Sequence, residues 1–257
     1  MKDTSSQFIA GIIPARYAST RFPGKPLAII GGKTMIERVY SQARKALELV
    51  YVATDDERIY NAVAGFGGSA VMTSDKHQSG TDRCAEAVGV IEKLTGKKTD
   101  IVINIQGDEP FIKPEQIRQL VSCFSEPSVD IATLVKKITP GENLFNPNHP
   151  KVVIDLNGNA LYFSRSVIPF VRDADEDKWL LKHVFFRHIG LYAYRTVVLE
   201  NITRLPRSPL ETAESLEQNR WLENGFRIRT AVTEFDSFSI DTPADLQKAE
   251  ELFGEFS

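Results

Sequence analysis

The sequence contains few residues that could form disulfides or bind zinc. Among 257 residues there are two cysteines, Cys84 and Cys123, and four histidines, with no CxxC or HExxH pattern. Zinc sites are usually built from closely spaced Cys and His ligands, and disulfide frameworks need more cysteines. We therefore expect two reduced, partly buried thiols and neither a zinc centre nor a disulfide scaffold.

Long apolar runs and an excess of positive charge are also missing. No apolar stretch approaches the roughly 20 residues that span a bilayer, and the first residues, MKDTSSQF, lack the basic and apolar regions of a signal peptide. We expect a cytoplasmic protein with no membrane partner. The net charge of -3 argues against a nucleic-acid partner, so any phosphate binding must depend on local clusters of cations.

The first predicted strand leads into a loop that lacks both common nucleotide-binding patterns, GxxxxGK[ST] and GxGxxG. What stands there instead is IAGIIPARYASTRFPGK, residues 9–25. The apolar run from Ile9 to Ile13 predicts a buried strand, and the small-residue loop after it carries Arg16, Arg21 and Lys25. Backbone N–H groups and cations in such a loop can approach a polyphosphate closely. The segment therefore predicts a nucleoside triphosphate site.

Strand and helix signals alternate in the first half of the chain. Apolar strands are predicted at 8–13, 49–54, 69–73 and 100–105, with helices near 34–47, 57–65, 80–94 and 114–124. This order predicts an α/β fold with a mostly parallel, doubly wound sheet. After about residue 129, strand signals at 129–137, 151–156, 161–165 and 188–195, with a turn at Asn157-Gly158, predict a smaller mixed-sheet extension.

Two capping boxes mark helices near the C-terminus, beginning at Ser208 and at Thr242. The first helix is expected to run to about Asn224, which would place Glu214 and Gln218 on adjoining faces. The second follows FSIDTPADL, residues 238–246, where we expect a strand to end near Asp241.

Carboxylates follow the predicted strands at the edge where parallel sheets bind ligands. Asp108 lies in QGDEP directly after strand 100–105, Asp241 precedes the last helix, and Asp55 follows strand 49–54. Gly107 would let the backbone approach a ligand closely. A pair of carboxylates with phosphate oxygens and waters suits Mg²⁺, although each Asp alone is also common in turns and before helices.

Two further groups of polar residues are weaker candidates. The HQSGTDR segment, residues 77–83, could be a second ligand loop, or Ser79 or Thr81 could simply cap a helix. His188 and Tyr192 share a face of strand 188–195, and Arg165 could bind a carboxylate bidentately. Such a set could bind a polyhydroxylated acid, but each residue taken singly is more often structural.

Eight segments, in this order, resemble the 3-deoxy-manno-octulosonate cytidylyltransferase family: IIPARYASTRFPGKPL, ATDD, HQSGTDR, NIQGDEPFI, YFSRSVIPF, RHIGLYAYR, SPLETAESLEQNRWLENG and IDTPADL. The resemblance runs from about residue 8 to residue 253. It implies a GT-A-like nucleotidyltransferase fold, a homodimer, Mg²⁺, and transfer of CMP from CTP to 3-deoxy-D-manno-octulosonate (Kdo) for lipopolysaccharide synthesis. It further implies one domain, 1–257, with a CTP-binding half (8–128), a sugar-binding and dimerisation part (129–210) and a C-terminal part (211–257).

The same resemblance implies roles for individual residues. Catalysis would involve Arg16, Arg21, Lys25 and Asp108, and the metal would be held by Asp108 and Asp241. The nucleotide would contact Arg16, Ser19, Arg21, Lys25, Ser79, Gly80 and Arg83. The sugar acid would contact Gln106, Arg165, His188, Tyr192, Glu214 and Gln218.

The sequence departs from the family at one turn and leaves other substrates open. Family members often have a Gly turn before ATD, whereas here we expect the helix to run through KALELVYVATD. SRSVIPF and LETAESLEQ match the Kdo branch by resemblance, with sialic acid and 8-amino-Kdo as alternative sugars. A catalytically silent nucleotide-binding protein is the alternative from another class. It is disfavoured because Lys25, Asp108 and Asp241 are all present.

Overall fold

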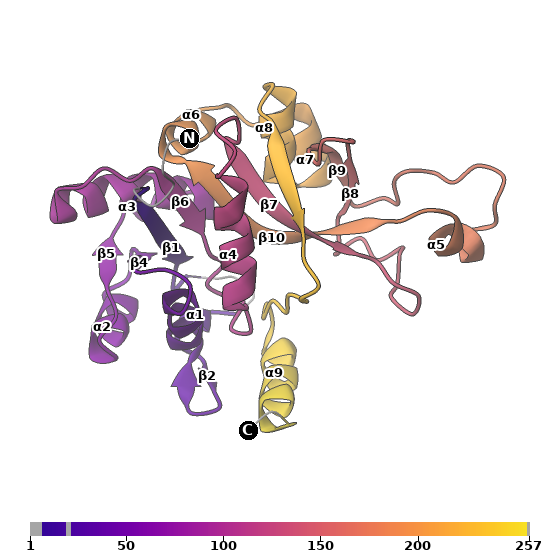
Figure 1. The fold of residues 1–257 in the computed structure, drawn as a ribbon. Coiled ribbons are helices and arrows are strands. Elements are labelled where there is room, and N and C mark those ends of the chain that lie inside the picture. The colour runs from indigo at the N-terminus through magenta and orange to yellow at the C-terminus, as the bar shows by residue number, and fades with distance from the viewer. Residues whose placement is uncertain (1–6, 19–21, 256–257) are drawn as a thin grey trace. The chain divides into compact units, whose positions relative to one another are not determined.

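The structure is a computed structural model that describes residues 7–18 and 22–255. It contains two compact units, each built from several stretches of the chain (Figure 1). The first unit comprises Met1–Arg118, Tyr194–Thr203 and Ser237–Ser257, and the second comprises Gln119–Ala193 and Arg204–Asp236. The short stretch 194–203 thus belongs with the N-terminal part, and the return of the chain to that part begins at Ser237 rather than at residue 211.

The first unit is built on four parallel strands. They are β1 (Ile9–Ala15), β4 (Val50–Thr54), β5 (Ala70–Met72) and β6 (Ile101–Asn104), in the spatial order β6-β1-β4-β5. Along the chain, β1, β4 and β5 succeed one another in one direction, and β6 then lies on the other side of β1. The strand order therefore reverses between β1 and β6, and ligands of such sheets bind beyond the carboxyl ends of the strands at this point.

Helices cover the strands of the first unit. These helices are α1 (Met35–Arg44), α2 (Glu57–Gly65), α3 (Gly80–Thr95), α6 (Thr196–Ile202) and the first part of α4 (Pro114–Cys123). Every residue of β6 is buried, as are most residues of β1 and β4. Because neighbouring side chains of a strand point to opposite faces, both faces of the sheet are covered. The doubly wound α/β fold expected from the sequence is confirmed for this unit.

The expected helix through KALELVYVATD is wrong, because α1 ends at Arg44. Lys45 and Ala46 form a turn, and the Leu47 N–H donates to the Ala43 carbonyl at 3.0 Å. The chain then enters β4 at Val50. A turn without glycine therefore joins α1 to β4.

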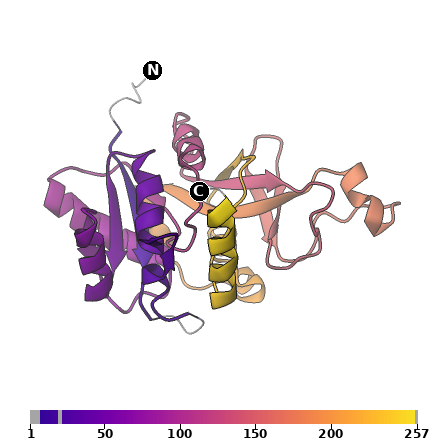
Figure 2. The same ribbon diagram turned by 90° about the horizontal axis from the view of Figure 1, so that it is seen from below.

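The C-terminal segment returns to the first unit and ends in α9 (Pro243–Glu255), drawn yellow in Figures 1 and 2. Ile240 and Ala249 pack with Ile30 and Met35 in a buried cluster, next to the hairpin β2 (Ile29–Ile30) and β3 (Lys33–Thr34). The Thr242–Asp245 capping box is present. The expected strand before Asp241 is absent from the described residues, where 237–242 form no ladder. The Ile240 N–H instead donates to the Asp108 carbonyl at 2.9 Å.

The second unit has strands β7 (Ile131–Lys137), β8 (Lys151–Ile154), β9 (Ala160–Ser164), β10 (Phe186–Arg195) and β11 (Ile228–Val232). The order β11-β7-β10 is extended by β8, which pairs antiparallel with β10 and β9. β11 pairs parallel with β7 and was not expected from the sequence. The expected turn joins β8 to β9, with Gly158 at a φ of 81°. The mixed sheet of this extension is confirmed.

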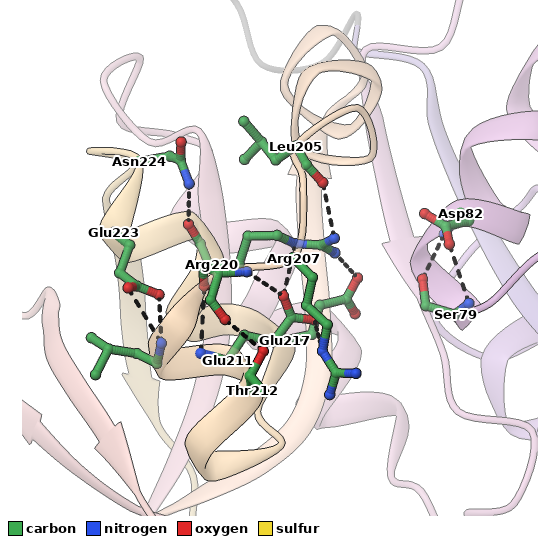
Figure 3. A network of polar contacts seen from close by, with 12 residues as sticks. Ser79, Asp82, Leu205, Arg207, Glu211, Thr212, Glu217, Arg220, Glu223 and Asn224 are labelled. Atoms are coloured by element: carbon green, nitrogen blue, oxygen red, sulfur yellow. Dashed lines mark hydrogen bonds and ion pairs between the residues drawn. The ribbon is translucent and has the colours of Figure 1, made fainter.

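The single helix expected between Ser208 and Asn224 is wrong. The capping box at Ser208 is present, but α7 (Pro209–Glu214) ends at Ser215, whose φ is 51°, and α8 (Glu217–Glu223) follows. Polar contacts hold the two short helices together, as Figure 3 shows: the Arg220 guanidinium donates to Glu217 at 2.7 Å and approaches Glu211 at 3.6 Å. Glu214 and Gln218 therefore do not lie on adjoining faces of one helix.

Candidate active site

A polar pocket of about 250 Å³ opens in the first unit beyond the carboxyl ends of β1 and β6. Five segments supply its walls: the end of β1, residues 25–26, the loop that leads into α3, the segment after β6, and Asp241 before α9. The lining residues include six of the predicted site residues, namely Arg16, Lys25, Ser79, Gly80, Arg83 and Gln106, together with both predicted metal ligands, Asp108 and Asp241. The position agrees with the reversal of strand order between β1 and β6.

The loop after β1 is held in shape around Tyr17. The Gly24 N–H donates to the Tyr17 carbonyl at 3.0 Å, and the Arg58 guanidinium stacks 3.3 Å from the centre of the Tyr17 ring. Gly24 has a φ of 72°, and a Cβ atom there would lie 3.1 Å from that ring. Glycine is needed here for both reasons. Arg16 is exposed at the pocket, whereas the predicted residues Ser19 and Arg21 lie outside the described residues.

Lys25 joins the two predicted metal ligands. Its Nζ lies 2.7 Å from Asp108 Oδ2 and 3.2 Å from Asp241 Oδ1. The three side chains are 16%, 25% and 38% exposed, so they are partly accessible from solvent. The link between the Ile240 N–H and the Asp108 carbonyl keeps the two carboxylate-bearing segments adjacent. Residues far apart in sequence thus converge on one point of the pocket.

The convergence of two carboxylates fits a magnesium ion. Mg²⁺ is commonly bound through one or two protein carboxylates, with waters and substrate phosphates as the other ligands. In the described part of the chain no cluster of three or more His, Cys, Asp or Glu residues suits a metal.

The HQSGTDR segment leads into α3 and lines the same pocket. Ser79 is the N-cap of α3, in a capping box with Asp82 (Figure 3). Arg83 follows on the first turn and is only 4% exposed. Its guanidinium donates to Asp55 Oδ2 at 2.9 Å and to Thr73 Oγ1 at 2.6 Å. The helix cap at Ser79 is confirmed, and the same segment lines the pocket, so a ligand loop there stays a prediction.

Gln106 and Gly107 form the wall after β6. The Gln106 amide donates to Asn104 Oδ1 at a long 3.4 Å. A Cβ atom on Gly107 would lie 3.0 Å from the carbonyl oxygen of Pro14. The close approach that Gly107 permits is therefore to the end of β1, and it keeps the two strand ends together at the pocket.

The other predicted sugar-acid residues lie in the second unit. On β10, the rings of His188 and Tyr192 are 5.2 Å apart, which confirms that they share a face. His188 Nε2 lies 3.0 Å from Thr133 Oγ1, and Tyr192 stacks edge-on against Trp221. Burial lowers the pKa of His188 to about 3, and burial raises the pKa of Tyr192 well above its ordinary value. Both side chains are therefore neutral near pH 7.

Arg165 and Glu214 contact each other at the end of β9. Arg165 donates from Nε to the Glu214 carbonyl at 2.7 Å and from the other guanidinium nitrogens to the Pro147 and Ser215 carbonyls. Three of the five guanidinium N–H groups are thus used by the protein itself. The Glu214 carboxylate accepts from Ser164 Oγ at 2.6 Å and from the Arg165 N–H at 2.9 Å.

The charge of Glu214 is stabilised by its neighbours. Burial alone raises the pKa of Glu214, but hydrogen bonds from Ser164, the Arg165 backbone and Tyr162, with the positive charge of Arg165, outweigh it and lower the pKa overall. The carboxylate is therefore ionised at neutral pH, and together with Arg165 it fixes the junction between α7 and β9.

Gln218 differs from this pair because one of its polar atoms has no partner among the residues that the structure describes. The side chain is 5% exposed, and its buried Nε2 makes no hydrogen bond to any of them. The next residue, Asn219, is fully buried and pairs with the Phe163 backbone, donating to its carbonyl at 2.9 Å. A buried amide donor without a partner costs free energy, so Gln218 is a strong candidate for a ligand contact.

Several residues that shape these sites had no sequence signal strong enough to select them. Thr73, Thr133, Asn219 and Glu86 act through long-range contacts that no local motif reveals. Asp55 follows a predicted strand, but its partnership with Arg83 depends on the way β4 and α3 are packed.

The parallel sheet, with a cation-bearing loop after β1 and the carboxylates of Asp108 and Asp241 paired in one pocket, defines a nucleotidyltransferase. The cytidylyltransferase family model matches residues 10–234, and the chain belongs to this family. The chain is 59% identical over 245 residues to the 3-deoxy-manno-octulosonate cytidylyltransferase of Bacteroides thetaiotaomicron, covering 94% of this chain and 96% of the relative. It is 51% identical over 250 residues to the enzyme of that name from Thermodesulfovibrio yellowstonii, covering 96% and 98%.

A solved structure agrees with this assignment. CMP:2-keto-3-deoxy-manno-octonic acid synthetase, determined in complex with CTP, aligns with a TM-score of 0.87 and 42% identity, covering 98% of this chain and all of that one. The GT-A-like nucleotidyltransferase fold expected from the sequence is thereby confirmed. In the part of the chain that the structure describes, no helix is both long and apolar enough to cross a membrane.

Proposed function

We propose that the protein transfers CMP from CTP to Kdo, giving CMP-Kdo and pyrophosphate for lipopolysaccharide synthesis. The observation that carries this proposal is the convergence of Lys25, Asp108 and Asp241 in the pocket beyond β1 and β6. The relatives that match almost the whole chain bear the name of this activity. The CTP complex of the similar synthetase supports the choice of nucleotide.

The chemistry follows from the charges in the pocket. The anomeric hydroxyl of the sugar acid attacks the α-phosphorus of CTP, and the bond to pyrophosphate breaks in line with it. Negative charge grows on the leaving pyrophosphate, and cations fixed in the pocket stabilise it. Arg16 and Lys25 line the pocket and would supply that charge, together with Arg21, as the family resemblance implies.

Asp108 and Asp241 would hold Mg²⁺, because their carboxylates lie against one Lys25 ammonium. When bound, the metal would lower the pKa of the attacking hydroxyl and neutralise phosphate oxygens. Asp108 acts in this proposal mainly as a metal ligand rather than as a base. Removal of divalent cations with EDTA is expected to abolish turnover, and added Mg²⁺ should restore it.

The sugar acid would be bound by the polar set in the second unit, Arg165, His188, Tyr192, Glu214 and Gln218. Gln106 lines the pocket of the first unit, and only the family resemblance assigns it to the sugar acid. Neutral His188 and Tyr192 offer hydrogen bonds to hydroxyls, and the two unused N–H groups of Arg165 suit a carboxylate. The unpartnered Gln218 Nε2 is a further donor.

We also propose a cytoplasmic homodimer. The segment around α5 (Trp179–Lys182) extends away from the strands of its own unit in Figures 1 and 2. It exposes Phe170 and Leu181, which are 74% and 77% accessible. Exposed apolar side chains of this size favour an interface with another protein surface. Light scattering after size exclusion should give twice the 28.8 kDa chain mass, and a Phe170→Ser, Leu181→Ser variant should give the monomer.

The test of the activity is pyrophosphate release with Mg²⁺, CTP and Kdo. Sialic acid and 8-amino-Kdo are run as alternative sugars, and ATP, GTP and UTP as alternative nucleotides. Release with CTP and Kdo alone is the expected result. Release only with another acidic sugar would refute the sugar assignment, and no release with any pair would leave the silent nucleotide-binding protein as the better description.

A further inference from the structure

The Glu86 carboxylate on α3 contacts the loop that precedes this helix and lines the pocket. The Glu86 side chain lies two turns into α3 and accepts a hydrogen bond from the Ser74 N–H at 2.8 Å. The same oxygen, Oε2, contacts Nε2 of His77. Both partners lie in the segment that links β5 to α3, so one side chain holds two points of that connection.

The near end of the connection is fixed at Thr73, whose N–H donates to the Thr54 carbonyl at 2.8 Å and whose Oγ1 accepts from Arg83 at 2.6 Å. Within it, the Lys76 N–H donates to Ser74 Oγ at 3.2 Å, and the Gln78 amide donates to the Lys76 carbonyl at 3.1 Å. These contacts are local and exposed. The far end is fixed at Ser79 by the capping box of α3. Glu86 therefore supplies the attachment of the middle of the loop to the body of the first unit.

The attached part of the loop is the part that lines the pocket. Residues 77–80 and Arg83 line it, whereas Glu86 does not. Burial raises the pKa of Glu86, but hydrogen bonds from Ser74 and His77 and the charges of His77 and Arg83 lower it overall. The carboxylate is thus ionised at neutral pH, the form in which such hydrogen bonds are strongest.

We propose that Glu86 is a positioning residue for nucleotide binding, which holds residues 77–80 in the shape that lines the pocket by fastening Ser74 and His77. This inference rests on the proposed function, because it assigns the pocket to the nucleotide. Glu86 itself touches no substrate. Without the Glu86 carboxylate the loop is less ordered before the nucleotide binds. Ordering it on binding then costs free energy, and the affinity for the nucleotide falls.

The experiment compares Glu86→Gln with Glu92→Gln. Glu92 is a matched control on the same helix: it also accepts from a backbone N–H, that of Thr99 at 2.9 Å, and from a cation, Lys98 at 2.6 Å. Its contacts hold the connection to β6, at the end of α3 away from the pocket-lining residues. CTP binding is measured by calorimetry without sugar, beside the melting temperature of each variant.

We expect Glu86→Gln to weaken CTP binding about ten-fold, the effect of a lost charge-assisted hydrogen bond, and Glu92→Gln to leave it within about two-fold, with both variants losing thermal stability. Glu86→Asp keeps the charge but shortens the reach, and should weaken binding by an intermediate factor. It also serves as the second variant if Glu86→Gln does not fold.

Wild-type affinity in Glu86→Gln or Glu86→Asp, together with a lowered melting temperature, would show a purely structural role and overturn the inference. If the wild type binds another nucleoside triphosphate instead of CTP, the proposed function fails, and the same comparison with that nucleotide still decides the role of Glu86. If the wild type binds none, both are overturned.

Discussion

The two units present polar groups in opposite ways. In the first unit, the charged side chains of Lys25, Asp108 and Asp241 stand partly in solvent around an open pocket. In the second, Tyr192 and Gln218 are 7% and 5% exposed, and His188 is held neutral among aromatic rings. The first arrangement suits a highly charged ligand whose own charges complete the site, and the second suits the hydroxyl groups of a sugar.

The largest expected effect is the fall in turnover when the charge of Asp108 is removed. Asp108→Asn keeps the size of the side chain but removes the negative charge that faces Lys25 and would hold the metal. Turnover should fall on the order of 100-fold or more, measured as pyrophosphate release at saturating substrates. Asp100→Asn, before the start of the same strand, β6, where Asp100 accepts from the Phe8 N–H, should stay within about two-fold. Near-normal turnover of Asp108→Asn would refute the metal assignment.

A substitution of Gln218 in the second unit should change the binding of the sugar acid without lowering the stability of the protein. Gln218→Leu removes a buried donor that has no partner, so the free energy of unfolding should be unchanged or higher. The KM for the sugar acid should rise about 30-fold, because a ligand hydrogen bond is lost. Gln116→Leu is the contrast: Gln116 is equally buried, but it accepts from the Lys113 N–H at 3.0 Å.

That control should lose about 1–3 kcal/mol of stability and keep its KM for the sugar acid. A destabilised Gln218→Leu with an unchanged KM would show that Gln218 is a structural residue.

Asp55 pairs with the buried guanidinium of Arg83 in the first unit, so a substitution of Asp55 shows whether this ion pair orients Arg83. Asp55→Asn leaves the Arg83 guanidinium without its counter-charge, and we expect the KM for CTP to rise about ten-fold with loss of stability. Glu57→Gln is the control, because Glu57 is an exposed carboxylate two residues away, on the first turn of α2. If both variants bind CTP like the wild type, Arg83 is not oriented through Asp55.

The smallest expected effect is on the free energy of unfolding, whose pH dependence includes a contribution from His188. Its folded-state pKa of about 3 lies below the value of 6.5 expected when unfolded. The unfolded chain therefore binds more protons between these values, and stability is lost as the pH falls below about 6.5. Between about pH 7 and pH 6 the loss should be about 0.7 kcal/mol.

Urea unfolding at the two pH values measures this loss. His188→Gln should remove it, while His183→Gln, at an exposed position of the second unit, should not. The same pH dependence in His188→Gln and the wild type would show that other groups cause it.

The sequence predicted most strands and helices of the first unit, because their signals are local: helix 57–65 matches α2, and the Ser79 and Thr242 caps are present. It failed where tertiary contacts decide. β11 forms because it pairs with β7, and the helix after Ser208 breaks at Ser215, whose φ is 51°, before α8 begins at Glu217. For the site, motifs placed Lys25 and Asp108 correctly in one pocket, but the supporting roles of Asp55 and Glu86 depend on packing across elements.

The most direct test of the division between the units is one matrix of initial rates, with both CTP and Kdo varied, for wild type, Asp55→Asn and Gln218→Leu. We predict a crossed pattern: Asp55→Asn raises the KM for CTP and leaves that for Kdo unchanged, and Gln218→Leu does the reverse. Equal increases in both KM values for both variants would contradict the assignment of the nucleotide to the first unit and of the sugar acid to the second.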